Sequence, residues 1–251
     1  MSALTPAIVE LRGISYHYPQ LLTLRRSGLF ELSLGFQSGK IYGVVGPNGA
    51  GKSTLFKLLS GALKPKEGEI YFCGSAVSRW PLWRRARLGV GYLSQHGSLA
   101  ARLSVDLNLR LGLSAGKRWG MELSRPHETL EGTYEQLIKE MGLSELKQQR
   151  VSTLSGGERR RCELAKLILQ RPRVLLLDEP FAALDRDAIG LTLHLINRAK
   201  AWGAMVLLTD HQNTYVNKVC DEIITLNEGR VIQTPPQDCL HEFSYEEHES
   251  V

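Results

Sequence analysis

The sequence predicts an α/β fold with a mainly parallel sheet, and two features of its apolar pattern lead to that prediction. Short apolar runs typical of strands recur along the chain, and leucines at helical spacing lie between several of them. Strands that alternate with helices favour parallel pairing, because each parallel crossover needs a long connection. Ligands bind such sheets at the carboxyl ends of the strands, so polar motifs at those ends are candidate site residues.

The individual elements follow from the same pattern. Helical spacing appears at Leu55, Leu58 and Leu59, and again at Leu164 and Ile168. The predicted strands cover residues 8–11, 41–45, 70–72, 90–93, 174–177, 205–208 and 223–226. The order of strands and helices therefore predicts one α/β core.

The middle of the chain has a different character from this core. Residues from about 95 to 160 have few strand-like runs and more helical patterns, such as 134–141, so we expect a mostly helical lobe inserted into the core. Within it, 114–120 (SAGKRWG) is predicted as a loop. Residues 1–235 are expected to form a single domain. Residues 236–251 form an acidic tail without Lys or Arg, for which a solvated tail is favoured over a partner-docking one.

Composition narrows the class of protein. The 251 residues carry a formal net charge of +5, which suits an acidic partner but does not choose among nucleotide, nucleic acid and membrane surface. The four cysteines form no CxxC pair, so we expect a reducing cytosol rather than a disulfide framework or zinc site. The chain begins without the pattern of a secretory signal, and its longest apolar runs are too short to span a bilayer. Another chain would have to hold it at a membrane.

A phosphate-binding loop is the first motif that carries chemistry. Residues 46–54 read GPNGAGKST, which matches GxxxxGK[ST] between a predicted strand and a predicted helix. Glycines allow the backbone to wrap a phosphate, and the helix N-terminus attracts the anion. Lys52 is predicted to reach the β- and γ-phosphates, and the Ser53 hydroxyl to bind Mg²⁺. The predicted nucleotide-binding residues here are Gly46, Pro47, Asn48, Gly49, Ala50, Gly51, Lys52, Ser53 and Thr54.

Two further motifs fit the same chemistry. The apolar run at 174–177 ends in two carboxylates; Asp178 is predicted to help hold Mg²⁺ and Glu179 to orient and polarise the attacking water. Residues 154–158 read LSGGE, a helix start in which Ser155 and Glu158 form a capping box. Two glycines behind the cap are poor helix formers, which makes sense if a phosphate approaches their bare N–H groups.

The order of these motifs resembles the ATP-binding cassette (ABC) family. GPNGAGKST, Gln95, LSGGE, LLLDEP and His211 follow one another as in that family, over about residues 8–235. The resemblance implies a P-loop NTPase core with a small antiparallel β lobe and an inserted helical lobe, which binds and hydrolyses ATP with Mg²⁺. It also implies a head-to-tail dimer in which Ser155, Gly156 and Gly157 contact the γ-phosphate held by the partner's loop.

Other positions carry over from the family one by one. Gln95 matches the glutamine that senses Mg²⁺ and water and couples them to the transport partner, and His211 matches the histidine that holds the γ-phosphate and the catalytic glutamate. Tyr18 matches the aromatic residue that stacks on adenine, with Tyr16 as a close competitor. Arg186 stands where many relatives have proline, a departure that puts none of the expected catalytic residues in doubt.

Several local stretches are similar to the lipopolysaccharide-export subgroup of these ATPases. They are LSGGERRR at 154–161, DEPFAALD at 178–185, LLTDH at 207–211 and the segment 89–109. The similarity implies a homodimer under integral membrane transporter subunits, at the cytoplasmic face of the inner membrane. A long basic insert at 21–30 does not fit the subgroup neatly.

Two alternatives remain at this point. Import ATPases for branched-chain amino acids are similar over the same stretches. ABC ATPases that act on ribosomes or DNA are disfavoured, because they usually carry twin cassettes or long coiled-coil inserts and this chain has one phosphate loop and no sustained heptads. We therefore expect no nucleic-acid partner.

Overall fold

The larger of two sheets is mainly parallel and forms the centre of the molecule. The structure, a computed structural model, describes residues 7–19, 28–95, 97–118, 130–211 and 213–232. The strands β3 (Ile41–Val45), β6 (Val90–Leu93), β7 (Val174–Asp178), β8 (Met205–Thr209), β9 (Glu222–Asn227) and β10 (Arg230–Ile232) lie in the order β10-β9-β3-β8-β7-β6. All neighbours pair in parallel except β10 and β9. Every residue of β7 and β8 is buried, which explains their unbroken apolar sequences.

The second sheet is antiparallel and contains β2 (Gly28–Gln37), β1 (Ala7–His17), β4 (Glu67–Phe72) and β5 (Ser75–Ala76), in that order. The sequence pattern did not predict β2, because polar residues alternate along it and it has no continuous apolar run. Residues 28–30, the last part of the insert predicted at 21–30, belong to this strand. Residues 20–27 lie outside the described residues.

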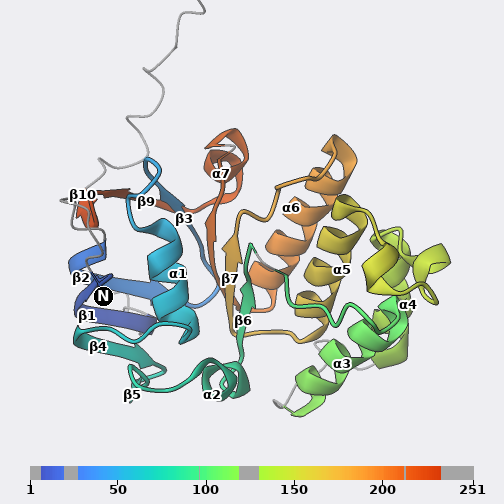
Figure 1. Ribbon diagram of the computed structural model, residues 1–251, viewed down its shortest axis with the longest axis horizontal. Coiled ribbons are helices and arrows are strands. Elements are labelled where there is room, and N and C mark those ends of the chain that lie inside the picture. Colours follow the sequence, from blue (N-terminus) through green and yellow to red (C-terminus); the bar gives the residue numbers. More distant parts are fainter. Residues whose placement is uncertain (1–6, 20–27, 96, 119–129, 212, 233–251) are drawn as a thin grey trace, which may run out of the picture.

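Helices cover both faces of the parallel sheet (Figure 1). Helix α1 (Lys52–Ser60) packs between the two sheets, whereas α5 (Gly156–Leu169) and α6 (Arg186–Ala201) pack on the opposite face. One apolar core joins α1 to the antiparallel sheet, and a second joins α5 and α6 to the helical lobe. The short helices α2 (Leu82–Arg87) and α7 (Asn213–Val219) precede β6 and β9. The arrangement confirms the predicted α/β fold with a small antiparallel sheet.

The helical lobe lies beside α5. It contains α3 (Val105–Arg118), α4 (Leu130–Glu140) and the 3-10 turns Ser144–Leu146 and Val151–Thr153. The loop predicted at 114–120 is wrong over 114–118, which are helical. Tertiary packing overrides the weak propensity there, since Leu109 and Leu113 are buried. Gly112 permits this packing, because a Cβ at Gly112 would lie 2.6 Å from the carbonyl oxygen of Lys166 on α5.

The acidic tail predicted at 236–251 lies outside the described residues. Within the described ranges, no helix combines the length and apolar character needed to cross a bilayer.

Candidate active site

The phosphate loop joins β3 to α1 and depends on glycine at defined points. A Cβ at Gly46 would lie 2.1 Å from the carbonyl oxygen of Leu226, and φ is +147° there. Gly49 has φ +82° and no atom within 4 Å of a Cβ position, so the backbone is open where a phosphate would lie. Gly51 precedes α1 in the left-handed region and supplies no side-chain cap. The first N–H groups of α1 are therefore free of a side-chain cap and can face an anion.

Lys52 lies over this loop. Its Nζ donates to the carbonyl oxygens of Gly46, at 2.6 Å, and Pro47, at 3.1 Å. Burial lowers the pKa of Lys52, while the carboxylates of Glu179 and Asp178 act in the opposite direction. The lysine is thus close to the position that the phosphate loop would give to the β- and γ-phosphates.

Asp178 ends β7 and is buried beside Ser53. Burial raises its pKa, as does the charge of Glu179, whereas a hydrogen bond from Ser53 and the charge of Arg160 lower it. One carboxylate oxygen, Oδ1, is buried without a hydrogen-bond partner among the described residues. A buried unpaired carboxylate oxygen next to a hydroxyl is the hard donor set that Mg²⁺ prefers, so these residues fit the metal.

The carboxylate of Glu179 contacts two other residues that the sequence analysis selected, Gln95 and His211. Its Oε1 accepts a hydrogen bond from Gln95 Nε2 at 2.8 Å and lies 3.0 Å from His211 Nε2. The backbone of Glu179 has φ +53°, and its N–H donates to the Thr209 carbonyl at 2.8 Å. A non-glycine residue in the left-handed region is uncommon and often marks a functional position. The side chains of Gln95 and His211, which follow β6 and β8, therefore converge on the carboxylate of Glu179, which follows β7.

The candidate aromatic residues differ in exposure. Tyr16 is buried in the core between the sheets, and its ring meets Tyr18 edge-to-face with centroids 5.0 Å apart. Tyr18 is only partly buried, and its hydroxyl lies 3.4 Å from Thr54 Oγ1, next to the phosphate loop. This difference favours Tyr18 as the adenine-stacking residue, although stacking itself stays a prediction.

The motif at 155–157 lies at the start of α5, and no described contact joins it to the phosphate loop of the same chain. Ser155 and Glu158 form the predicted capping box, with Glu158 N–H to Ser155 Oγ at 3.3 Å and Ser155 N–H to Glu158 Oε2 at 2.8 Å. A Cβ on Gly156 would meet no atom within 4 Å. The open backbone of this helix start is available to a ligand brought by another molecule.

Some residues that the sequence analysis did not predict lie around the site and hold its backbone by hydrogen bonds. The buried Arg160 donates to the carbonyl oxygens of Asp178 and Glu179, and Asp210 Oδ2 accepts from the Phe181 N–H at 3.0 Å. Burial and the nearby carboxylate of Asp178 raise the pKa of Tyr92, which keeps its hydroxyl protonated. A single sequence holds no signal for Arg160, because it reads as one of three consecutive arginines.

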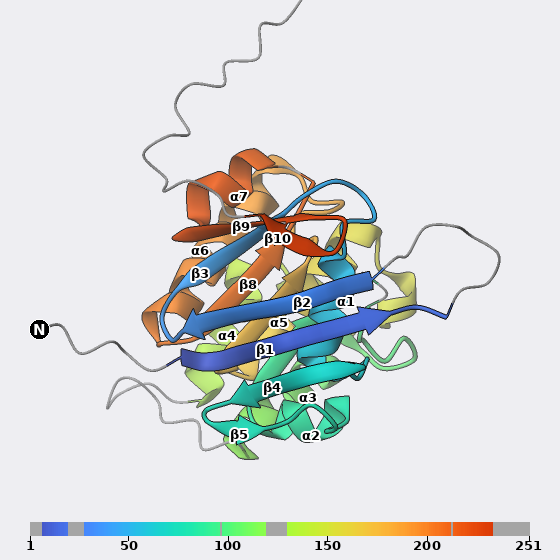
Figure 2. The ribbon, with the colours of Figure 1, turned by 90° about the vertical axis from the view of Figure 1, so that its left-hand side faces the viewer.

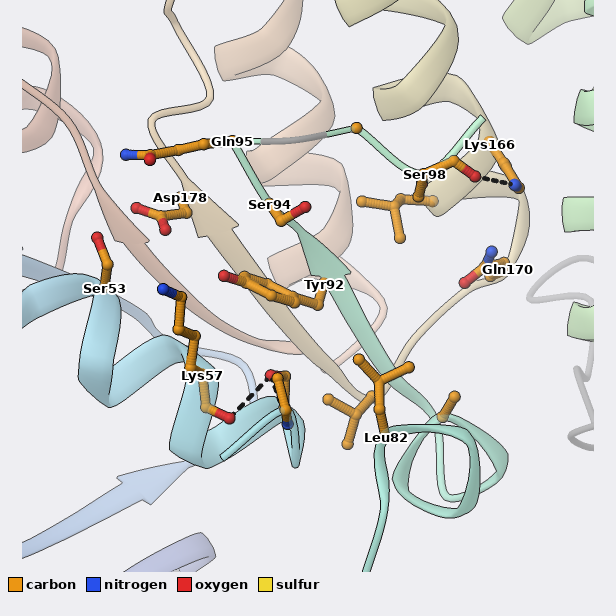
Figure 3. A pocket seen from close by; sticks show the side chains of 16 residues that line it. Ser53, Lys57, Leu82, Tyr92, Ser94, Gln95, Ser98, Lys166, Gln170 and Asp178 are labelled. Atoms are coloured by element: carbon orange, nitrogen blue, oxygen red, sulfur yellow. Dashed lines mark hydrogen bonds between the residues drawn. The ribbon is translucent and has the colours of Figure 1, made fainter. Parts of the chain in front are cut away.

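A cavity of about 510 Å³ runs from the candidate metal site toward the helical lobe (Figure 3). Ser53, Asp178 and Gln95 lie at its inner end, and Tyr92 forms part of its wall. Leu82 of α2 and Lys166 of α5 lie farther out. The cavity thus extends from the residues predicted to bind Mg²⁺ and to sense the attacking water to the outer surface between α2 and α5.

The loop, the paired carboxylates and the parallel sheet define a phosphate-loop NTPase. Comparison with known proteins makes the class more specific. Residues 29–182 match the family model described as "ABC transporter". The chain belongs to the ABC transporter family and is an ATPase of that family.

Individual relatives agree with this assignment. The Lipopolysaccharide export system ATP-binding protein LptB of Acidithiobacillus ferridurans is 36% identical over 217 residues, which are 86% of this chain and 87% of the relative. A solved ATP-binding subunit of an ABC transporter is 27% identical with a TM-score of 0.76, covering 92% of this chain and 90% of that one. A dimeric, post-hydrolysis ATP-binding cassette bound to ADP and Pi is 23% identical, also with a TM-score of 0.76, covering 90% and 97%.

Proposed function

We propose that this chain is the ATP-hydrolysing subunit of a lipopolysaccharide exporter and works at the cytoplasmic face of the inner membrane. The observation that carries the proposal is the 36% identity to a lipopolysaccharide export ATP-binding protein over most of both chains. That relative favours lipopolysaccharide export over import of branched-chain amino acids. In this proposal residues 1–235 form one cassette with the helical lobe inserted at about 95–160.

Hydrolysis would proceed by in-line attack of water on the γ-phosphate. Glu179 orients and polarises the water, and its carboxylate is held between Gln95 at 2.8 Å and His211 at 3.0 Å. Lys52 and the N–H groups of the loop neutralise charge on the phosphates. His211 also holds the γ-phosphate, and Tyr18 stacks on adenine.

Ser53, Asp178 and Gln95 would hold the Mg²⁺ that accompanies ATP. The buried, unpartnered Oδ1 of Asp178 supports this proposal. When bound, the metal would offset negative charge on the phosphate oxygens. The raised pKa of Asp178 has burial as its main cause, and a nearby cation would favour the ionised form that binds metal.

A second copy of the chain would complete each nucleotide site. The open helix start at Ser155, Gly156 and Gly157 has no described contact with its own phosphate loop, which supports a role toward the loop of a partner. The cassette that was solved as a dimer with ADP and Pi has the same fold. One chain carries both halves of the site, so a homodimer would have two working sites.

Purification of the chain from gently solubilised native membranes tests the cargo assignment. We expect two membrane subunits of the lipopolysaccharide-export type to co-purify. Amino-acid permease subunits would contradict export and support the import alternative. Ribosomal or DNA-associated proteins without a membrane partner would contradict the transporter role and leave the ATPase.

A further inference from the structure

The turn between β9 and β10 contacts the phosphate loop, although the two segments are far apart in the sequence. Figures 1 and 2 both show β9 and β10 beside β2, next to the blue segment that joins β3 to α1. The N–H of Gly229 in this turn donates to the carbonyl oxygen of Ala50 in the loop at 3.0 Å. Both residues are buried. The turn therefore forms one wall of the phosphate loop.

A second contact joins the other end of the loop to the same hairpin. A Cβ on Gly46 would lie 2.1 Å from the carbonyl oxygen of Leu226 on β9, so the two backbones are in close contact. Leu226 is fully buried, and a packed core gives it little room to move. The β9–β10 hairpin thus supports the phosphate loop both at its first residue and close to the start of α1.

The start of β2 holds this turn in place from the other side. The Phe30 N–H donates to the carbonyl oxygen of Gly229 at 2.9 Å. A Cβ on Gly229 would lie 2.4 Å from the carbonyl oxygen of Gly28 and 2.9 Å from the Phe30 ring. Only glycine fits there without a shift of the turn or of β2. Gly229 is therefore packed between β2 and the phosphate loop and is hydrogen-bonded to both.

The hydrogen bond to Ala50 sets the direction of the next N–H group in the loop. In a planar trans peptide the C=O and N–H bonds point in opposite directions. While Gly229 binds the carbonyl oxygen of Ala50, the N–H of Gly51 therefore points away from the hairpin. A phosphate loop binds its anion through such backbone N–H groups, and binding is tighter when they are oriented beforehand.

We propose that the β9–β10 turn belongs to the nucleotide site, where Gly229 is a positioning residue for the peptide between Ala50 and Gly51. The proposal rests on the proposed role of the phosphate loop. Gly229 acts through the loop rather than by contact with the nucleotide. Displacement of the turn should weaken the binding of ATP and ADP and leave the chemical step intact, because the hairpin makes no described contact with the carboxylate of Glu179.

A second turn of the same conformation provides a matched control. Cys73 and Gly74 connect β4 to β5 with φ angles of +47° and +76°, and Glu228 and Gly229 connect β9 to β10 with φ angles of +48° and +76°. Two left-handed residues in a two-residue hairpin loop are typical of a type I′ turn. Gly74 is exposed, and a Cβ there would meet no atom within 4 Å. Alanine imposes the same backbone strain at both glycines, but only at Gly229 does it also collide with β2 beside the phosphate loop.

Titration with a fluorescent ADP analogue tests the proposal. Gly229→Ala should raise Kd about tenfold, the scale of one weakened hydrogen bond to a charged group, and should raise KM for ATP with little change in kcat. Gly74→Ala should bind as the unsubstituted chain does, although both variants lose stability. An unchanged Kd in Gly229→Ala, or an equal rise in Gly74→Ala, would overturn the proposal. If Lys52→Ala loses nucleotide binding while Gly229→Ala keeps it, the phosphate-loop assignment stands and only this inference fails.

Hydrogen–deuterium exchange of the unsubstituted chain provides a test that does not depend on the folding of a variant. Saturating ADP with Mg²⁺ should slow exchange in the peptide that contains Gly229, because an ordered phosphate loop holds the Ala50 carbonyl oxygen in place for its N–H. The peptide that contains Gly74 should respond much less. No response at Gly229, or equal responses of the two turns, would contradict a link between the β9–β10 turn and the nucleotide.

Discussion

Arg160 holds the backbone of Glu179 from inside the protein. Its Nη2 donates to the Glu179 carbonyl oxygen at 2.6 Å and to that of Asp178 at 2.8 Å, and its Nη1 donates to the Ser94 carbonyl oxygen at 3.1 Å. Ser94 precedes Gln95. Arg160 lies on α5, which begins at the LSGGE motif. Its guanidinium therefore links this motif to the segments of the same chain that carry Gln95, Asp178 and Glu179.

Loss of Arg160 should therefore displace the catalytic segment. Arg160→Gln removes a buried charge and some of its hydrogen bonds, and we expect kcat to fall about 10- to 100-fold, because small misplacements of catalytic groups are costly. KM for ATP should change much less, since Arg160 makes no described contact with the phosphate loop. Steady-state ATPase kinetics measure both. Arg12→Gln, which removes an exposed arginine on β1, is the control. Equal loss of nucleotide affinity and turnover would contradict a positioning role.

Lys52→Ala should abolish both nucleotide binding and turnover. The ammonium lies over the loop carbonyls and is the cation expected to neutralise the β- and γ-phosphates. Fluorescent-nucleotide titration and phosphate release measure the two effects separately. Near-normal turnover would contradict the assignment of the phosphate loop.

The two tyrosines should respond differently. Tyr18→Ala should raise KM for ATP about two- to tenfold, the usual contribution of one stacked ring, with little change in kcat. Tyr16→Phe keeps the buried ring in the core and should leave both constants unchanged. ATP titration of each purified variant decides the question. An unchanged KM for ATP in Tyr18→Ala would contradict the assignment of Tyr18 as the adenine-stacking residue.

In the protein without bound Mg²⁺, the ionised side chain of Asp178 should lower the free energy of unfolding at neutral pH. Its pKa is raised by burial, so the folded state binds a proton more tightly than the unfolded state, and stability falls as pH rises through the interval between the two pKa values. Asp178→Asn should therefore raise Tm at neutral pH without Mg²⁺ while abolishing turnover. The gain should shrink as pH is lowered and the native carboxyl becomes protonated. Thermal melts at several pH values measure it; a variant less stable than the unsubstituted chain at neutral pH would contradict this account.

The sequence predicts the strands β3, β6, β7 and β8 well because they are largely buried and therefore consist of continuous, mostly apolar runs. The same criterion missed β2, whose residues alternate between core and surface. Residues 114–118, predicted as a loop, belong to helix α3 because packing of this helix against α5 outweighs local propensity. Lys52, Ser53, Asp178 and Glu179 could be selected because their motifs are local in sequence. Arg160 could not, because its partners lie 18, 19 and 66 residues away and only the fold brings them together.

The most direct test of the proposed mechanism is light scattering of Glu179→Gln with and without ATP and Mg²⁺. The amide keeps the size of the side chain and a hydrogen bond for His211 or Gln95 but cannot polarise water as a carboxylate does. We predict no turnover and a stable dimer of twice the chain mass that forms only with ATP. A variant that remains monomeric in saturating ATP would contradict the claim that the Ser155 helix start of one chain completes the nucleotide site of another.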